Sequence, residues 1–182
     1  LHDIGKSKIP RNILDKPGKL TSEEYEEVKL HTIYGYEMIS ESMDDKVTAI
    51  VALQHHERDD ASGYPRALHA DQIHPYSHIC AVADVYSAMT TTRVYQSKQQ
   101  LLTVLRELYR LSFGKLNGRP THAFIQQMLP NFIGKKVLLT TGESGIIVMN
   151  NPSDYFRPLV KTEDRFIDLS KEYNTEIQEI LL

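Results

Sequence analysis

The sequence predicts a mainly α-helical chain with a small β extension at its C-terminal end. Apolar residues recur at helical spacing through most of residues 1–131, whereas from Lys136 onward short apolar runs alternate with Gly-containing turns. With 182 residues and 41% hydrophobic content, the chain is long enough to bury one substantial core. We therefore expect a helical core over residues 1–131 and a small β extension with a terminal helix over residues 132–182.

The first long helix is predicted from its N-terminal cap. Thr21 followed by Glu24 has the spacing of a capping box, and the helical pattern after it continues to about Ser42. Gly35 lies in the middle of this helix and costs about 1 kcal/mol relative to Ala. Two explanations stay open: another backbone or a ligand approaches closely at Gly35, or the glycine relieves crowding around the tyrosines beside it.

Another helix is predicted over residues 78–91. Its large apolar residues form one stripe, made of Ile79, Val82, Ala83 and Tyr86. Asp84 lies on another face among small apolar residues, so we expect a buried carboxylate that needs a cation. Either a metal ion or a salt bridge with Arg93 supplies that cation.

Beyond Tyr95 the pattern predicts two further helices and then several strands. One helix covers residues 99–113 with an apolar face that includes Phe113, and the next begins after Pro120. The later elements are a hairpin over 137–149, strands over 157–161 and 166–169, and a helix over 174–182.

Composition excludes some classes of function. The net charge of −3 argues against binding to nucleic-acid polymers, which requires an extended basic surface. Cys80 is the single cysteine, so the chain forms no internal disulfide, as is usual in a reducing compartment. No apolar run reaches about 18 residues. We therefore expect a cytoplasmic segment that makes no membrane contact of its own.

Histidines and carboxylates cluster in the first half of the chain and indicate a metal centre. Seven of the eight histidines fall between His2 and His78. The clusters are His2-Asp3, His31, His55-His56-Glu57 and Asp84. Imidazole and carboxylate together bind iron, manganese or zinc, and a carboxylate can bridge two ions.

Each cluster also has an ordinary structural explanation. An isolated His-Asp pair is more often a surface or core pair than a metal site. His55 and His56 diverge by about 100° on a helix, so both reach one ion only where the helix ends or bends. Residues 58–65 contain Gly63 and Pro65 and predict such an end. Alternatively, the double histidine interacts only with the helix dipole.

Several motifs resemble the HD-GYP domains of bacterial signalling proteins in order and spacing. The matching segments are His2-Asp3-Ile4-Gly5-Lys6, residues 13–20, His31, His55-His56-Glu57-Arg58, Gly63-Tyr64-Pro65 and Ala83-Asp84-Val85-Tyr86. The resemblance is dense from Leu1 to Tyr95 and loose beyond. It implies an HD-type helical bundle followed by a small β extension.

The resemblance implies a phosphodiesterase that hydrolyses cyclic di-GMP to linear pGpG, and on to GMP in some members. Two divalent ions, iron or manganese, would hold a bridging hydroxide that attacks phosphorus. One ion would be held by His2, Asp3 and Asp84, and the other by Asp3, His31, His55 and His56. A third ion would require ligands from an N-terminal helix that precedes the His-Asp pair in the family and is missing from this sequence.

The same resemblance assigns the remaining site residues. Asp3 and Lys6 are the expected catalytic residues, and Lys6, Tyr64 and Arg93 are the expected contacts to substrate phosphate or guanine. The expected protein partner is a second copy of the chain, contacted through the apolar end of residues 174–182, or a covalently linked regulatory domain.

Two departures from the family pattern keep other functions open. Ala61 stands where a glycine is usual, and alanine tolerates a positive φ poorly. Ser87 stands where many members carry an aspartate or a basic residue. The alternatives are a degenerate module that binds a cyclic dinucleotide or a protein, a phosphodiesterase for another cyclic dinucleotide such as cyclic GMP-AMP, and an HD-type hydrolase of another nucleotide.

Overall fold

The computed structural model describes residues 1–91 and 98–181, which form two compact units. The first unit comprises residues 1–87 and 111–120, and the second comprises residues 88–110 and 121–182. The predicted fold class is confirmed, because helices precede a five-stranded antiparallel sheet. The expected boundary after residue 131 stays a prediction. Among the described residues, no helix is both long and apolar enough to cross a membrane.

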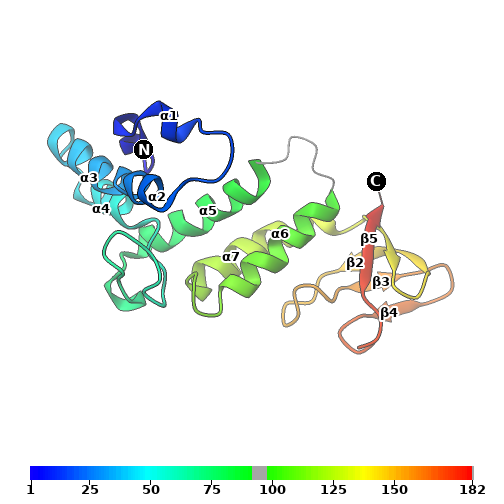
Figure 1. Cartoon of the computed structure of the whole chain (residues 1–182). Coiled ribbons are helices and arrows are strands. Elements are labelled where there is room, and N and C mark those ends of the chain that lie inside the picture. The colour runs from blue at the N-terminus through cyan, green and yellow to red at the C-terminus, as the bar shows by residue number, and fades with distance from the viewer. Residues whose placement is uncertain (92–97, 182) are drawn as a thin grey trace. The chain divides into compact units, whose positions relative to one another are not determined.

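The helices of the first unit surround the N-terminal residues (Figure 1). They are the 3-10 helix η1 (Ile4–Lys8), α1 (Arg11–Leu14), α2 (Ser22–Lys29), α3 (His31–Ser42), α4 (Lys46–Gln54), the 3-10 helix η2 (Ala70–Gln72) and the part of α5 (Pro75–Thr91) that ends at Ser87. Helices α3 and α4 pack through Ile39, Ala49 and Ala52, which are nearly inaccessible to solvent, with Tyr36 against them. This packing fixes the ends of α3 and α4, from which three histidines project.

The helix predicted to run from Thr21 to Ser42 is broken at Leu30, so this prediction was wrong in one respect. The capping box is confirmed, since the Thr21 hydroxyl accepts from the backbone N–H of Glu24. The break follows from two side chains that take up helix carbonyls. The His31 ring bonds to the carbonyl of Val28, and the Thr32 hydroxyl donates to the carbonyl of Lys29. Side chains that compete for these carbonyls interrupt the helical ladder.

The N-terminal segment lies directly on α3. A Cβ built on Gly5 would fall 2.0 Å from the carbonyl oxygen of His31 and 2.5 Å from the backbone nitrogen of Gly35. A Cβ on Gly35 would instead meet its nearest neighbours at 3.5 Å, an ordinary contact. Another backbone does lie against Gly35, but the position that requires glycine is Gly5. This contact holds His2 and Asp3 beside His31.

The buried face of α5 differs from the predicted apolar stripe. Ile79 is 54% exposed and Ala83 is exposed, whereas Ser77 and Ala81 are buried together with Val82. The buried face of this helix is therefore rotated from the predicted stripe and shares only Val82 with it. Asp84 is half-buried, as its side chain is 23% exposed.

The second unit packs helices against the sheet. It contains α6 (Lys98–Leu111), α7 (Gly118–Met128), the 3-10 helix η3 (Leu129–Phe132), β1 (Lys136–Leu139), β2 (Ser144–Met149), β3 (Leu159–Lys161), β4 (Phe166–Asp168) and β5 (Ile177–Leu181). The strand order is β4-β3-β2-β1-β5. The predicted hairpin and the two strands after it are confirmed. Phe113 is 70% exposed, contrary to prediction, because α6 ends at Leu111, before the turn at Gly114.

The predicted terminal helix over residues 174–182 was wrong, because β5 occupies most of this segment. Ile177 and Ile180 are both buried, and their spacing of three residues is typical of a helix. The pairing with β1 shifts register between Leu138 and Leu139, which pair with Glu179 and Ile177, so Gln178 is an extra residue. A bulge of this kind allows two apolar residues three apart to face the same side of a sheet.

Candidate metal centre

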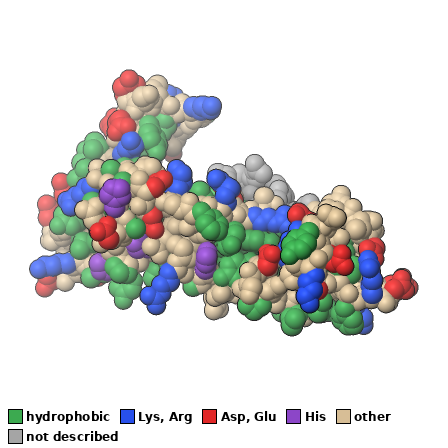
Figure 2. All heavy atoms as spheres, turned by 90° about the horizontal axis from the view of Figure 1, so that it is seen from below, with side chains coloured by type: hydrophobic (Ala, Val, Ile, Leu, Met, Phe, Trp, Pro, Cys, Tyr) green, Lys and Arg blue, Asp and Glu red, His purple; other side chains and the backbone are tan. Residues whose placement is uncertain are grey.

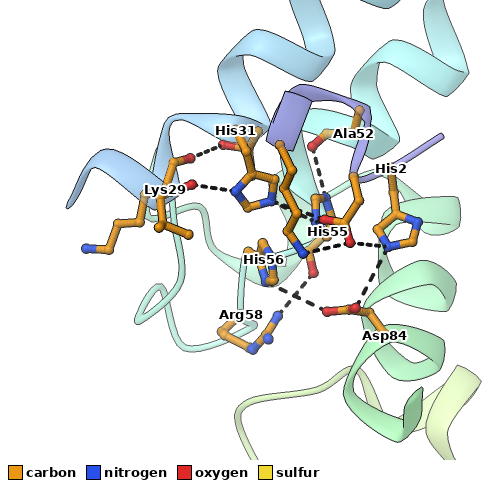
Figure 3. Close-up of polar contacts among 12 residues, drawn as sticks. His2, Lys29, His31, Ala52, His55, His56, Arg58 and Asp84 are labelled. Carbon is orange, nitrogen blue, oxygen red and sulfur yellow. Dashed lines mark hydrogen bonds and ion pairs between the residues drawn. The ribbon is translucent and has the colours of Figure 1, made fainter. Parts of the chain in front are cut away.

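The predicted ligands come together in two groups that share Asp3. Figure 3 shows five of them close together: His2, His31, His55, His56 and Asp84. One group contains His2, Asp3 and Asp84, and the other contains Asp3, His31, His55 and His56. Within each group, one ligand atom from every residue lies within 4.8 Å of the others. The residues come from the segment before η1, the start of α3, the end of α4 and the middle of α5.

The two most buried histidines present unprotonated nitrogens to each other. The Nδ1 of His31 lies 2.6 Å from the carbonyl oxygen of Val28, and that of His55 lies 2.9 Å from the carbonyl oxygen of Ala52. Each Nδ1 is thus placed to donate its proton to a carbonyl, and in the neutral form of the ring Nε2 then carries a free lone pair. The two Nε2 atoms are only 3.4 Å apart. Backbone carbonyls that fix histidine tautomers in this way are usual around metal ions.

The shared carboxylate adds a third acceptor at the same place. Asp3 Oδ1 is buried and forms no hydrogen bond with any described residue. It lies 3.5 Å from the Nε2 of His31 and 3.7 Å from that of His55. Three lone-pair acceptors without a proton donor between them repel one another unless a cation binds there. The residues of this inner group therefore fit a divalent metal ion.

The outer group is more open to solvent. His2 Nε2 lies 3.4 Å from Asp3 Oδ2 and 3.8 Å from Asp84 Oδ1, with the His2 side chain 34% exposed. Figure 2 shows histidine and acidic side chains together on the surface of the first unit. Lys6 donates to Asp3 Oδ2 at 2.8 Å, so a lysine and an imidazole contact the same carboxylate oxygen.

The charged state of the histidines differs between the two groups. The hydrogen bond with Asp3, and then that with Asp84, raises the pKa of His2 to about 9. Burial and the charges of His55 and His31 lower the pKa of His56 to about 3, and burial also lowers the pKa of His31. In the metal-free chain at neutral pH, His2 is therefore protonated, while His31 and His56 are neutral.

The two carboxylates remain ionised. Burial by itself would raise the pKa of Asp3, but the contacts from His2 and Lys6 hold it well below its usual range. The hydrogen bond with His2 likewise lowers the pKa of Asp84. Negative charge is thus present at both groups over the physiological pH range.

We expect the two groups to differ in the pH dependence of metal binding. A cation at the outer group must displace the proton on His2, so its affinity should fall about tenfold for each pH unit below 9. His31 and His56 carry no such proton, so the inner group should depend less on pH. Manganese titrations between about pH 6 and about pH 9, with bound metal measured after dialysis, check this. Equal slopes for the two ions would contradict it.

The end of α4 places the double histidine as the sequence predicted. The helix ends at Gln54, so the rings of His55 and His56 can lie with their centroids 4.1 Å apart, and both residues reach the inner group. A Cβ on Gly63 would lie 2.5 Å from the carbonyl oxygen of His56, so the Gly-Tyr-Pro loop runs directly against this helix end. The Tyr64 backbone N–H donates to that same carbonyl.

Glu57 anchors the loop, a role that sequence reasoning missed. Its side chain is buried, and its carboxylate accepts from the backbone N–H groups of Arg66 and Leu68 at 2.7 and 2.9 Å. The next residue, Arg58, donates to the carbonyls of His55 and Glu57. The sequence does contain a signal for this role. Glu57 lies between a helix end and a loop that contains Gly and Pro, and the backbone N–H groups of such a loop need hydrogen-bond acceptors.

The predicted substrate contacts are only partly placed. Tyr64 stacks on His56 with ring centroids 4.6 Å apart and planes inclined by 26°. Lys6 contacts Asp3, as described above. Arg93 lies outside the described residues, so neither its substrate role nor its salt bridge to Asp84 can be assigned. Ser87 lies one turn beyond Asp84 on α5.

The loop requires a positive φ at two alanines. Ala61 has φ 59° and Ala67 has φ 50°, a left-handed conformation that alanine adopts at a cost. The strained backbone expected at Ala61 is thus confirmed. Ala67 has the same kind of strain, which the sequence did not indicate.

Replacing either alanine with glycine should therefore stabilise the first unit. We expect Ala61→Gly and Ala67→Gly each to raise the free energy of unfolding by about 1 kcal/mol. Ala83→Gly, at an exposed position within α5, should lower it by about 1 kcal/mol. Urea denaturation measures all three. A loss of stability in the two loop variants as large as that of Ala83→Gly would refute the strain.

Comparison with known proteins agrees with this geometry. A family model described as HD domain matches residues 1–111. A cyclic di-GMP phosphodiesterase of Thermotoga maritima is 48% identical over 118 residues, which are 64% of this chain and 32% of the relative. A cyclic di-GMP phosphodiesterase of Pseudomonas aeruginosa is 33% identical over 162 residues, 88% of this chain and 39% of the relative.

A third relative has a different substrate in its name. A 3'3'-cGAMP-specific phosphodiesterase of Vibrio cholerae is 42% identical over 98 residues, which are 53% of this chain and 19% of the relative. The chain spans about a third of the length of the Thermotoga relative. The chain belongs to the HD domain family, and its resemblance to HD-GYP domains is confirmed.

Proposed function

We propose that this chain is a metal-dependent phosphodiesterase that hydrolyses cyclic di-GMP to linear pGpG. One observation carries the proposal: two groups of candidate metal ligands share Asp3. In the inner group, the Nε2 atoms of two histidines and the buried Oδ1 of Asp3 converge on one place. Two relatives named as cyclic di-GMP phosphodiesterases align with 64% and 88% of this chain. Further cleavage to GMP belongs to the same proposal.

Two divalent ions, iron or manganese, would occupy the two groups. His2, Asp3 and Asp84 would hold one ion, and Asp3, His31, His55 and His56 the other. Such a pair supplies a water of lowered pKa and stabilises the attacking and leaving oxygens of an in-line displacement at phosphorus. Imidazole and carboxylate ligands are found at both iron and manganese sites, so the ligand set does not select between the two metals.

The residues around the ions would bind and orient the diester. Asp3 fixes the spacing of the two groups, and its short contact with Lys6 places an ammonium beside them. Lys6 is then available to a phosphate oxygen, whose negative charge it stabilises. The Tyr64 ring is held by His56, so its hydroxyl is the part of the side chain that can donate to substrate.

A second substrate has specific support. The Vibrio cholerae relative is named for 3'3'-cGAMP and aligns with about half of the chain. Both cyclic dinucleotides contain at least one guanine and the same kind of phosphodiester, so one metal centre could act on either. The residues that read the second base decide between them.

Anaerobic hydrolysis with metal analysis of the same sample tests the proposal. The chain is loaded with iron(II) or manganese(II), incubated with cyclic di-GMP, and its products are separated by chromatography. Linear pGpG with about two ions per chain supports the proposal. Full metal loading without product refutes cyclic di-GMP as substrate and directs the assay to cyclic GMP-AMP. Neither product nor metal would indicate a degenerate binding module.

We also expect a cytoplasmic location and either homodimerisation or a linked regulatory domain. The expected location follows from the composition of the sequence, and both expectations stay predictions. Size-exclusion chromatography with light scattering measures the oligomeric state of the chain.

A further inference from the structure

We propose that Tyr25, Lys29 and Glu26 on α2 form a subsite for a guanine base of the substrate. This inference rests on the proposed function, because it concerns where a cyclic dinucleotide would lie beside the metal centre. It gives α2 a role in base recognition, whereas the substrate contacts expected from the sequence motifs, Lys6, Tyr64 and Arg93, lie outside α2.

The ring of Tyr64 cannot by itself provide an open platform for a base. His56 stacks on it, and Lys29 Nζ lies over it at 5.6 Å from the centroid. A base that stacks on a protein needs an aromatic face that no other group covers. Tyr64 therefore joins the metal centre to α2, and the stacking partner must be another ring.

Tyr25 is the more exposed of the two rings, although Lys29 Nζ also lies over it, at 4.9 Å from the centroid. Its centroid lies 6.4 Å from that of Tyr64 with an interplanar angle of 78°, and the residue is 47% exposed. An aromatic side chain exposed to this extent and adjacent to the catalytic cluster has apolar surface that a bound base would cover. Stacking on such a ring is independent of sequence and supplies affinity.

The polar groups beside Tyr25 match the edge of guanine. Lys29 Nζ lies 4.9 Å from the Tyr25 centroid and donates to Glu26 Oε1 at 2.6 Å. In Figure 3 the Lys29 side chain points away from the histidines, so its ammonium lies outside the metal centre. A donor next to an acceptor is complementary to guanine, whose O6 accepts and whose N1–H donates on adjacent atoms. Adenine presents the opposite order along the same edge.

Steady-state kinetics of Tyr25→Leu tests the stacking contribution. We expect KM for cyclic di-GMP to rise about tenfold, within the range measured when stacked aromatic residues are truncated. Metal content should be retained. Hydrolysis of bis(p-nitrophenyl) phosphate, a diester without a base, should change by less than about twofold. Tyr76→Leu is the matched control, because Tyr76 is 60% exposed on α5.

Calorimetric titration with GMP and AMP tests base recognition without turnover. Their phosphates are identical, so any difference in affinity reports the base. We expect wild type to prefer GMP and Lys29→Met to lose most of this preference. Lys8→Met is the control, since Lys8 lies over the Tyr34 ring at 5.4 Å in a similar cation–π pair elsewhere in the unit.

The outcomes separate the two proposals. A wild type that hydrolyses cyclic di-GMP while Tyr25→Leu keeps its KM would overturn the subsite and leave the proposed function standing. Equal affinity of the wild type for GMP and AMP would refute the proposal that Lys29 and Glu26 recognise the edge of guanine. Wild type without cyclic di-GMP binding or hydrolysis would overturn the proposed function, and the subsite with it.

Discussion

Replacement of Asp3 by Asn should remove both metal ions and lower cyclic di-GMP hydrolysis by about a thousandfold or more. Asp3 is the one residue common to both ligand groups. Its Oδ1 faces the inner histidines, and its Oδ2 faces His2 and Lys6. An amide has the same shape but no negative charge, so both groups lose the anion that would bind the cations.

Substitution of Asp84 tests whether Asp3 binds both ions, because Asp84 would bind only one. Asp84 belongs only to the outer group, so Asp84→Asn should lose one ion and retain the other. Asp45→Asn is the control for charge, because Asp45 caps α4 and Asn caps a helix equally well. Plasma emission spectrometry counts the metal, and circular dichroism confirms the fold. Retention of two ions by Asp3→Asn would exclude the shared role.

The grouping of the candidate ligands came from the resemblance to HD-GYP domains, and only parts of it follow from local features of the chain. The helix end after Gln54 is encoded by the adjacent loop, and a helix end is what allows His55 and His56 to act together. Asp3 and His2 are neighbours in sequence, so a shared role for Asp3 needed no knowledge of the fold. The hairpin of β1 and β2 was likewise predictable from its turn.

Other features could not be predicted, because they depend on side-chain hydrogen bonds, a β-bulge and tertiary packing, which the periodic pattern of apolar residues does not encode. The break at Leu30 arises because His31 and Thr32 bond to backbone carbonyls with their side chains. The strand β5 was mistaken for a helix because a bulge gave Ile177 and Ile180 a helical spacing. The proximity of Tyr25 to Tyr64 depends on how α2 packs against a loop far along the chain, which spacing alone cannot show.

Gly5→Ala should destabilise the first unit by about 3 kcal/mol or more, as expected where a core has no room for a methyl group. The added carbon would lie 2.0 Å from the carbonyl oxygen of His31. Because that atom belongs to the backbone of α3, no rotation of a side chain relieves the clash. The N-terminal segment and α3 must move apart, which separates Asp3 from His31. Metal affinity of the inner group should therefore fall together with stability.

Gly35→Ala provides the matched test, because it adds the same methyl group on the other side of the same contact. The nearest atoms to that carbon lie at 3.5 Å, and alanine favours a helix interior by about 1 kcal/mol over glycine. We therefore expect stability equal to or above that of the wild type. Urea denaturation and manganese titration of both variants measure the two effects. Equal destabilisation by the two substitutions would show that both positions require glycine for its backbone flexibility and would refute the role of the close approach at Gly5. A loss confined to Gly5→Ala would show that the approach of two backbones at Gly5 is what holds Asp3 beside the histidines.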